Sequence, residues 1–191
     1  MEQIKEMTAQ ESLRLISETM NNSRRDILRN NAKFYVLWGC LLTIFSLFIY
    51  FMWHTTGKAS WNMLWFLLPV VGYPLSTFLQ KKNVALPQSF VGSLTGKIWS
   101  LFGLFAVTLS ALAVFVVPMP ITLIIVILFG MAESITGVVL KNWPIIIGGF
   151  ILAVGGAIAA TLLNTEAQIL LFTLGGVVLA TTGLIIKLQN S

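Results

Sequence analysis

Six long apolar runs constrain the fold of this chain more than any other feature of its sequence. We place them at about residues 34–53, 61–79, 97–117, 120–140, 144–163 and 167–186. Each is close to the ~20 residues with which a helix crosses a bilayer, and none alternates as a barrel strand does. Only 10% of the 191 residues are charged, against about 25% in soluble domains. We therefore predict an all-α, polytopic membrane protein with six transmembrane helices.

Basic residues collect on one side of the predicted spans. Four precede the first span and are expected to meet the membrane surface: Arg24, Arg25, Arg29 and Lys33. Lys141 and Lys187 follow the fourth and sixth spans, while the opposite side has only Lys58. The positive-inside rule then predicts a multi-pass membrane protein with both termini in the cytoplasm. Because the basic residues are spread over several loops, we expect the lipid bilayer as partner and no nucleic acid.

Residues 1–33 are predicted to form an amphipathic helix ahead of a transmembrane domain at 34–187. Its apolar side chains would share one face: Leu13, Ile16, Met20 and Ile27. Ser23 to Asp26 has the composition of a cap for a second helix that continues into the first span. Two roles stay open for residues 1–33, namely a helix lying on anionic lipid or a docking helix for a cytoplasmic protein partner.

The transmembrane part repeats itself with a period of about 46 residues. Leu128–Lys141 aligns with Leu174–Lys187, and the same shift places Gly103 on Gly149. We therefore predict three parallel-repeat helical hairpins, of which the first is the most diverged. Their expected limits are 34–80, 97–141 and 144–187.

A repeated pattern of glycine and proline resembles a known family. It consists of a glycine early in the outgoing helix, an outer turn with Pro118 and Pro120, and a glycine near the end of the returning helix. Over residues 97–187 this pattern resembles the HdeD-type acid-resistance membrane proteins. The first hairpin, with WNMLWFLLPVVGYP at residues 61–74, is more similar to uncharacterised bacterial six-span inner-membrane proteins. The HdeD resemblance implies a role in envelope or acid stress and supplies no mechanism.

Small residues line one face of each of the last two spans. The glycines among them are Gly149, Gly156, Gly176 and Gly183. Glycine faces let helix backbones approach closely, which favours helix association in lipid. We expect these faces to pack within the chain, and a homo-oligomer seam is the alternative.

Glu133 is the only ionisable residue deep inside a predicted span. A charge at the bilayer centre costs roughly 2.5–3.5 kcal/mol on insertion scales, and no basic residue lies at that depth to offset it. We therefore expect a neutral carboxyl that points into the helix bundle. Helical rise places Tyr73, Thr136 and Thr181 at a similar depth, where they would complete a polar layer.

Two prolines add to this predicted layer. Pro69 and Pro74 would kink the second span and free backbone carbonyls near Glu133. In the functional interpretation, Glu133 binds a proton or a cationic solute and Tyr73 orients it. In the structural interpretation, Glu133 is a protonated hydrogen-bond donor between helices.

Catalytic and metal-binding motifs are not evident in the sequence. The single histidine, His54, lies at an outer boundary where we expect lipid-headgroup contact, and Cys40 lies inside the first span. No Ser-His-Asp set, C-x-x-C or P-loop occurs, so we expect no catalytic residue, metal or cofactor.

Three function classes therefore remain. The first is a non-enzymatic inner-membrane protein of the envelope or acid-stress response, or a regulator acting through a cytoplasmic partner. The second is a small proton-coupled transporter or channel that uses Glu133. The third is a structural or assembly subunit of a membrane complex.

Overall fold

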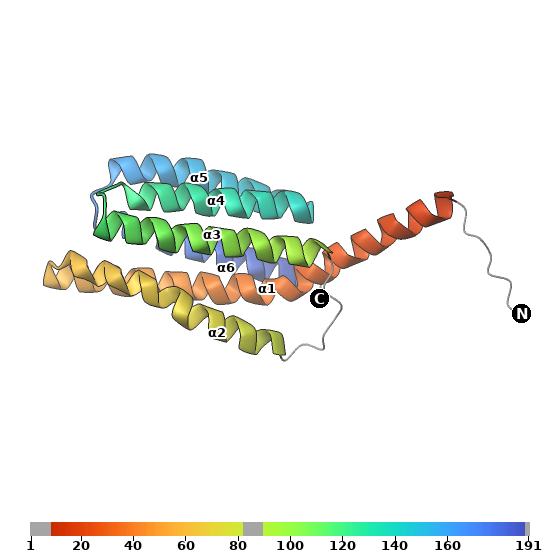
Figure 1. Cartoon of the computed structure of the whole chain (residues 1–191), viewed down its shortest axis with the longest axis horizontal. Helices are drawn as coiled ribbons and strands as arrows, with labels where there is room; N and C mark the ends of the chain where they lie inside the picture. The colour runs from red at the N-terminus through yellow and green to blue at the C-terminus, as the bar shows by residue number, and fades with distance from the viewer. Residues whose placement is uncertain (1–8, 82–89, 190–191) are drawn as a thin grey trace, which may run out of the picture.

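The computed structural model describes residues 9–81 and 90–189, with the side chains of residues 9, 23–31, 80, 81, 90, 91 and 189 outside the description (Figure 1). Every regular element in the described part is helical, which confirms the all-α prediction. The elements are α1 (Ala9–Thr56), the 3₁₀ helix η1 (Ala59–Phe66), α2 (Leu67–Lys81), α3 (Phe90–Phe115), α4 (Ile121–Leu140), α5 (Trp143–Leu162) and α6 (Ile169–Gln189).

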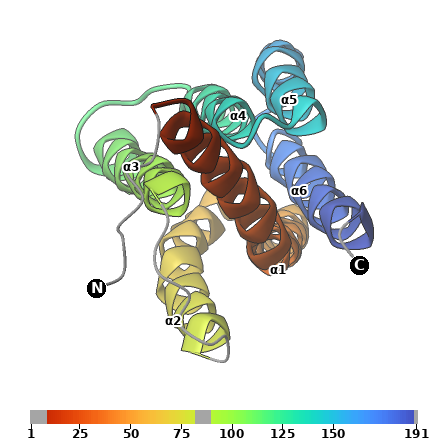
Figure 2. The ribbon, with the colours of Figure 1, turned by 90° about the vertical axis from the view of Figure 1, so that its right-hand side faces the viewer.

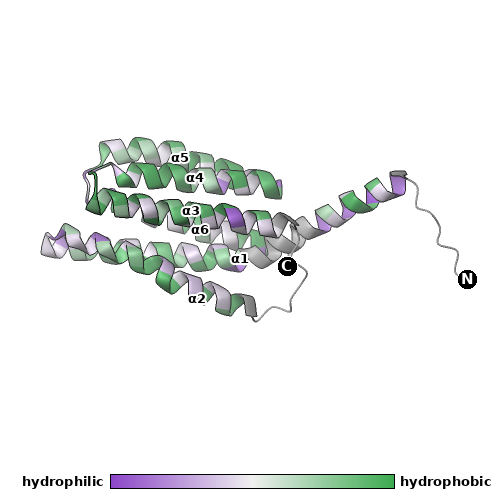
Figure 3. Cartoon of the chain, viewed as in Figure 1, coloured by the Kyte–Doolittle hydropathy of each residue, from purple (hydrophilic) through white to green (hydrophobic). Residues whose placement is uncertain are grey.

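Six helical stretches are long and apolar enough to cross a membrane. They are Ala32–Thr56, Ala59–Leu79, Gly92–Phe115, Ile121–Leu140, Trp143–Leu162 and Ile169–Leu188. Large apolar side chains are exposed along the helices of the bundle, whose residues are mostly hydrophobic (Figure 3). The prediction of a multi-pass membrane protein is therefore confirmed, although the third span begins at Gly92 and not at residue 97.

Helix α1 is one uninterrupted helix of 48 residues. The predicted helix break at Ser23 to Asp26 is therefore wrong. No proline or glycine lies between Ala9 and Phe34, and capping residues alone do not end a helix that favourable residues can continue. The first half of α1 projects beyond the end of the bundle, and polar and apolar residues alternate along it (Figures 1 and 3).

The predicted membrane-surface residues fall at the base of this projecting half. The side chains of Arg24, Arg25 and Arg29 lie outside the described residues. Lys33 is exposed.

The closest helix packing joins α1 to α6 and α4 to α5 (Figure 2). Each of these pairs joins helices from two different predicted hairpins. Contacts within the predicted hairpins are looser, both between α3 and α4 and between α5 and α6. Adjacency in sequence therefore sets the up-and-down topology, while glycine positions set which helices touch most closely.

Backbone-to-backbone contact at glycine explains both close pairs. A Cβ atom added to Gly39 of α1 would lie 2.5 Å from the carbonyl oxygen of Gly176 in α6. In the second pair, a Cβ added to Gly149 of α5 would lie 2.6 Å from the carbonyl oxygen of Gly130 in α4. Real side chains do not tolerate such distances, so only glycine permits this packing.

The other two predicted packing glycines have similar roles. Gly156 of α5 faces Val126 of α4, and Gly183 of α6 faces Ala32 and Tyr35 of α1. All four predicted packing glycines thus lie in contacts within the chain.

The second span differs from the others because it begins as η1 and continues as α2. Pro69 lies in the first turn of α2, just after the change from the 3₁₀ helix to the α-helix, and the kink at Pro69 stays a prediction. Pro74 does lie inside α2. Gly72 is covered by the indole ring of Trp38, and the end of α2 diverges from the bundle (Figures 1 and 2).

Candidate functional site

Helix α4 carries the residue around which the candidate site is built. Its buried residues recur every three or four positions and thus form one face. They include Phe129, Gly130, Glu133, Thr136, Gly137 and Leu140. Glu133 and Thr136 are both 0% exposed, so the predicted inward orientation of Glu133 is confirmed.

The carboxyl group of Glu133 lies at the interface with α5. A Cβ atom added to Gly148 would lie 3.9 Å from Glu133 Oε1. Both carboxyl oxygens are buried, and neither has a hydrogen-bond partner among the described residues. Thr136 does not supply one, because its hydroxyl donates to the Ala132 carbonyl oxygen at 2.8 Å.

Tyr35 of α1 is the titratable residue that faces this carboxyl. It is buried, lies close enough to Glu133 for electrostatic interaction, and its hydroxyl has no described hydrogen-bond partner. Helix α5 carries no titratable side chain, while Lys97 of α3 and Lys187 of α6 are exposed. The site therefore combines an acid and a phenol, without a described cation beside either.

Four aromatic rings pack against one another and form what we call the aromatic cluster: Tyr35, Trp99, Phe102 and Phe129. Trp99 of α3 is central, with ring centroids 6.5 Å from Tyr35, 5.7 Å from Phe102 and 5.6 Å from Phe129. Phe102 and Phe129 are 5.4 Å apart. Phe129 lies one helical turn before Glu133 on the buried face of α4, and α3 supplies two of the four rings.

Two of the predicted site residues lie elsewhere. Tyr73 is 71% exposed on α2, so its predicted contact with Glu133 is wrong. Thr181 is exposed on α6 and donates to the Val178 carbonyl oxygen of its own helix at 2.9 Å. Both predictions rested on depth along a helix, which does not determine the face on which a side chain lies.

Sequence reasoning missed Tyr35 as a member of the site. A usable signal was present, since Ala32, Tyr35 and Gly39 are spaced by three and four residues and share one face of α1. That face meets Gly176 and Gly183 of α6. The small residues thus bring α1 inward and turn the phenol towards α4.

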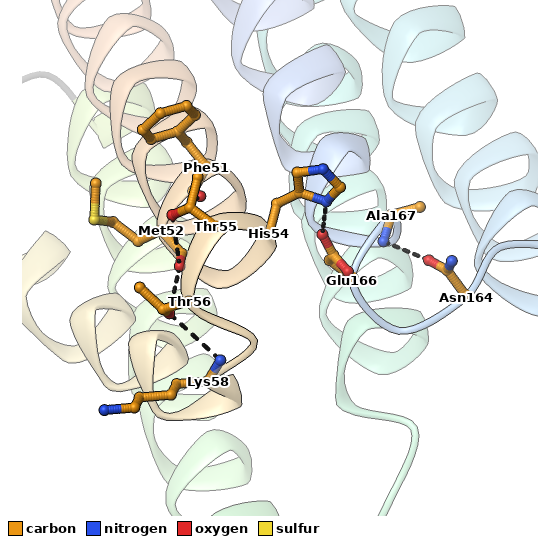
Figure 4. A network of polar contacts seen from close by, with 9 residues as sticks. All are labelled: Phe51, Met52, His54, Thr55, Thr56, Lys58, Asn164, Glu166 and Ala167. Atoms are coloured by element: carbon orange, nitrogen blue, oxygen red, sulfur yellow. Dashed lines mark hydrogen bonds and ion pairs between the residues drawn. The ribbon is translucent and has the colours of Figure 1, made fainter.

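A polar contact at the other end of the bundle was also missed. His54 Nδ1 at the end of α1 lies 2.7 Å from Glu166 Oε1 in the turn before α6 (Figure 4). The rings of Tyr50 and His54 stack with their centroids 5.8 Å apart. Asn164 stabilises the same turn, because its side-chain oxygen accepts a hydrogen bond from the Ala167 N–H at 2.8 Å. The protein itself therefore provides His54 with a partner, in addition to any lipid headgroup.

The chemistry of the Glu133 site is limited by what surrounds it. An ionised carboxylate there would be a buried charge without a described counter-charge, which is unfavourable, whereas a protonated carboxyl is neutral. Among the described residues, no group of three His, Cys, Asp or Glu side chains is placed to hold a metal ion. No family model, curated protein or solved structure matches the chain. A protonated Glu133 offers one hydrogen-bond donor and an acceptor oxygen at this interface.

Proposed function

We propose that this multi-pass membrane protein is a non-enzymatic, acid-responsive protein in which Glu133 is the proton-binding group. The observation that carries the proposal is the burial of both Glu133 carboxyl oxygens without a described hydrogen-bond partner. A structural acid would be expected to donate to a neighbouring acceptor, because a buried polar group without a hydrogen bond is costly. An unsatisfied buried polar group in a folded protein needs an explanation, and a role in function is one such explanation.

The proposed location is the bacterial inner membrane, with both termini in the cytoplasm. Lys33, Lys141 and Lys187 are exposed at the end of the bundle from which the first half of α1 projects (Figure 1). This charge distribution supports a cytoplasmic position for that end. The resemblance of residues 97–187 to HdeD-type proteins supports a role in acid or envelope stress.

The aromatic cluster suggests how proton loss would change the structure. An ionised Glu133 needs water or a hydrogen-bond donor, and both of its carboxyl oxygens are buried without a described partner. Helix α3 supplies Trp99 and Phe102 to the aromatic cluster, and its other described residues are exposed or half-buried, except for the buried Thr95. Deprotonation is therefore expected to loosen α3, and protonation to restore its packing.

Hydrogen exchange in lipid nanodiscs tests this proposal. Wild-type protein and Glu133→Gln are compared with each other at about pH 5 and again at about pH 8. The ratio of their exchange rates at one pH is independent of the intrinsic exchange rate, which itself changes with pH. We expect residues 97–115 to exchange faster in the wild type than in Glu133→Gln at the higher pH, and equally at the lower. The matched control is Glu166→Gln, which removes a half-buried acid in the turn before α6 and should follow the wild type. Equal exchange in wild type and Glu133→Gln at both pH values would overturn the proposal.

A small proton-coupled transporter or channel is the second candidate. The position of Glu133 well inside the fourth span favours it, since intramembrane acids mark proton pathways in transporters. Proteoliposomes with a pH-sensitive dye inside distinguish the two functions. Proton flux that is lost in Glu133→Gln and kept in Glu166→Gln would favour transport. An absence of flux together with the pH-dependent exchange described above would favour a sensor.

The third function class, an assembly subunit, rested on free glycine faces in the last two spans. Gly149 and Gly156 pack on α4, and Gly176 and Gly183 pack on α1. These contacts within the chain remove the observation on which that class depended.

A further inference from the structure

The projecting first half of α1 carries large apolar side chains that the bundle does not cover. Leu13 is 67% exposed, Ile16 57% and Met20 41%. They lie beyond the end of the six-span bundle, on a helix that continues without a break into the first span (Figure 1). This stripe therefore cannot lie flat on the bilayer while α1 stays intact.

The spacing of this stripe is that of a coiled coil. Residues 13, 16, 20, 23, 27, 30 and 34 alternate steps of three and four, which is the a/d pattern of a heptad repeat. We call these seven a and d positions the seam, because they would meet a partner helix. Five of them are apolar: Leu13, Ile16, Met20, Ile27 and Phe34. Ser23 and Asn30 occupy the other two, and polar seam residues are known to fix the register of such assemblies.

The positions that flank the seam permit pairing with an identical helix. In a parallel pair, each g residue meets the e residue five positions later in the partner. The resulting pairs are Ser12 with Ser17, Thr19 with Arg24, and Asp26 with Asn31. None of them places like charges together. The charged residues Glu11, Arg14, Glu18, Arg25 and Arg29 fall at the outer b, c and f positions.

A second copy of the chain is the occupant that this geometry favours. A partner must offer a parallel helix with the same register, standing at the same height above the membrane. A second copy embedded in the same membrane meets each condition, and confinement to the bilayer raises its effective concentration. We propose that residues 13–34 of two copies form a parallel two-stranded coiled coil at the end of the bundle from which α1 projects.

Cysteine cross-linking of the full chain in proteoliposomes tests this inference. Cys40→Ser first removes the native cysteine. A single cysteine is then introduced in one of two variants, Met20→Cys at a seam position or Glu18→Cys on the opposite face of the helix. With an oxidant or a short bismaleimide, we expect Met20→Cys to yield about tenfold more covalent dimer than Glu18→Cys. Equal yields would indicate random collision and would overturn the inference. The absence of covalent dimer with both reagents would also overturn the inference.

A second pair of variants separates seam packing from mere proximity. Ile16→Lys, added to Met20→Cys, places a charge in the seam and is expected to reduce the covalent dimer about tenfold. Leu15→Lys places the same charge at an outer c position and should leave the yield within about twofold. A fluorophore on Met20→Cys that brominated lipids quench would show the stripe lying on the membrane and would overturn the coiled coil.

Discussion

Helices α1 and α6, like α4 and α5, meet backbone to backbone, whereas α3 is held by bulky rings. The contrast is clearest at two glycines that correspond in the sequence repeat. Gly149 lies against Gly130 and Ser134, while Gly103 has no neighbouring atom within 4 Å of an added Cβ. Each close pair also has a hydrogen bond between its helices. Ser46 Oγ lies 2.7 Å from Thr173 Oγ1, and Ser134 Oγ donates to the Ile146 carbonyl oxygen at 3.2 Å.

We call the two closely packed helix pairs, α1 with α6 and α4 with α5, the frame, and we call α3 with its rings the cover. Glu133 lies on α4, within a close pair, so its position is fixed by the backbone contacts around Gly130 and Gly149. Trp99 and Phe102 of the aromatic cluster belong to α3, a helix that is not held by such backbone contacts at glycine. A proton-dependent change is therefore expected to move α3 and to leave the two close pairs intact.

The largest expected effect comes from filling a glycine contact. Gly149→Leu forces a side chain into the backbones of α4 and α5, and overpacking of this kind should lower the free energy of unfolding by about 3 kcal/mol or more. Gly103→Leu is the matched control and should stay within about 0.5 kcal/mol of wild type. Unfolding in mixed micelles, followed by circular dichroism, measures both. Similar losses for the two variants would remove the distinction between frame and cover.

Removing the central ring of the aromatic cluster should have the next largest effect. Trp99→Ala deletes three ring contacts, each worth about 0.5–1.5 kcal/mol, so we expect a loss of about 2 kcal/mol. Faster hydrogen exchange should be confined to α3. Phe105→Ala, on the exposed face of the same helix, is the control and should change little. Faster exchange in α5 or α6 would show that the cluster supports the frame as well.

A smaller effect is expected from the hydrogen bond that joins α1 and α6. Ser46→Ala should cost about 0.6 kcal/mol, the average for hydrogen bonds between membrane helices. Thr181→Ala removes a hydroxyl that bonds only to its own helix and should be near neutral. The same micelle titration distinguishes them. A cost for Thr181→Ala equal to that of Ser46→Ala would argue against the special role of the interhelical bond.

The smallest effect is expected at the exposed contact between His54 and Glu166. Exposed ion pairs contribute about 0.2–1 kcal/mol and weaken as salt rises. Glu166→Gln should therefore lower the free energy of unfolding slightly at low salt and hardly at all at high salt. Unfolding titrations at two salt concentrations check this. A large, salt-independent loss would mean that this contact belongs to the frame.

Local sequence patterns predicted the spans well, because hydropathy and length alone set which segments can cross a bilayer. Glu133 was also identifiable, since one acid in an apolar run has few explanations. The pairing of α1 with α6 was not predictable in the same way. The pairing depends on a contact between Gly39 and Gly176, which lie far apart in the sequence. No local sequence pattern indicates which glycine contacts which.

The errors at the site have a common physical cause. Tyr73 and Thr181 lie near the predicted depth but on the wrong faces of their helices. Tyr35 was overlooked because an aromatic residue near a span end resembles an interfacial anchor. Tertiary packing determines which face of a helix is buried. The spacing of small residues on α1 indicates that face only when the partner helix is known.

Infrared spectroscopy of the protonated carboxyl band in lipid tests the central claim most directly. Wild type and Glu133→Gln are titrated from about pH 5 to about pH 8, with Glu166→Gln as the control. The account predicts a band that loses intensity as the pH rises in the wild type and in Glu166→Gln, and that is missing in Glu133→Gln. A Glu133 band that stays constant over this range would make the residue a structural hydrogen-bond donor and would contradict its role as a proton switch.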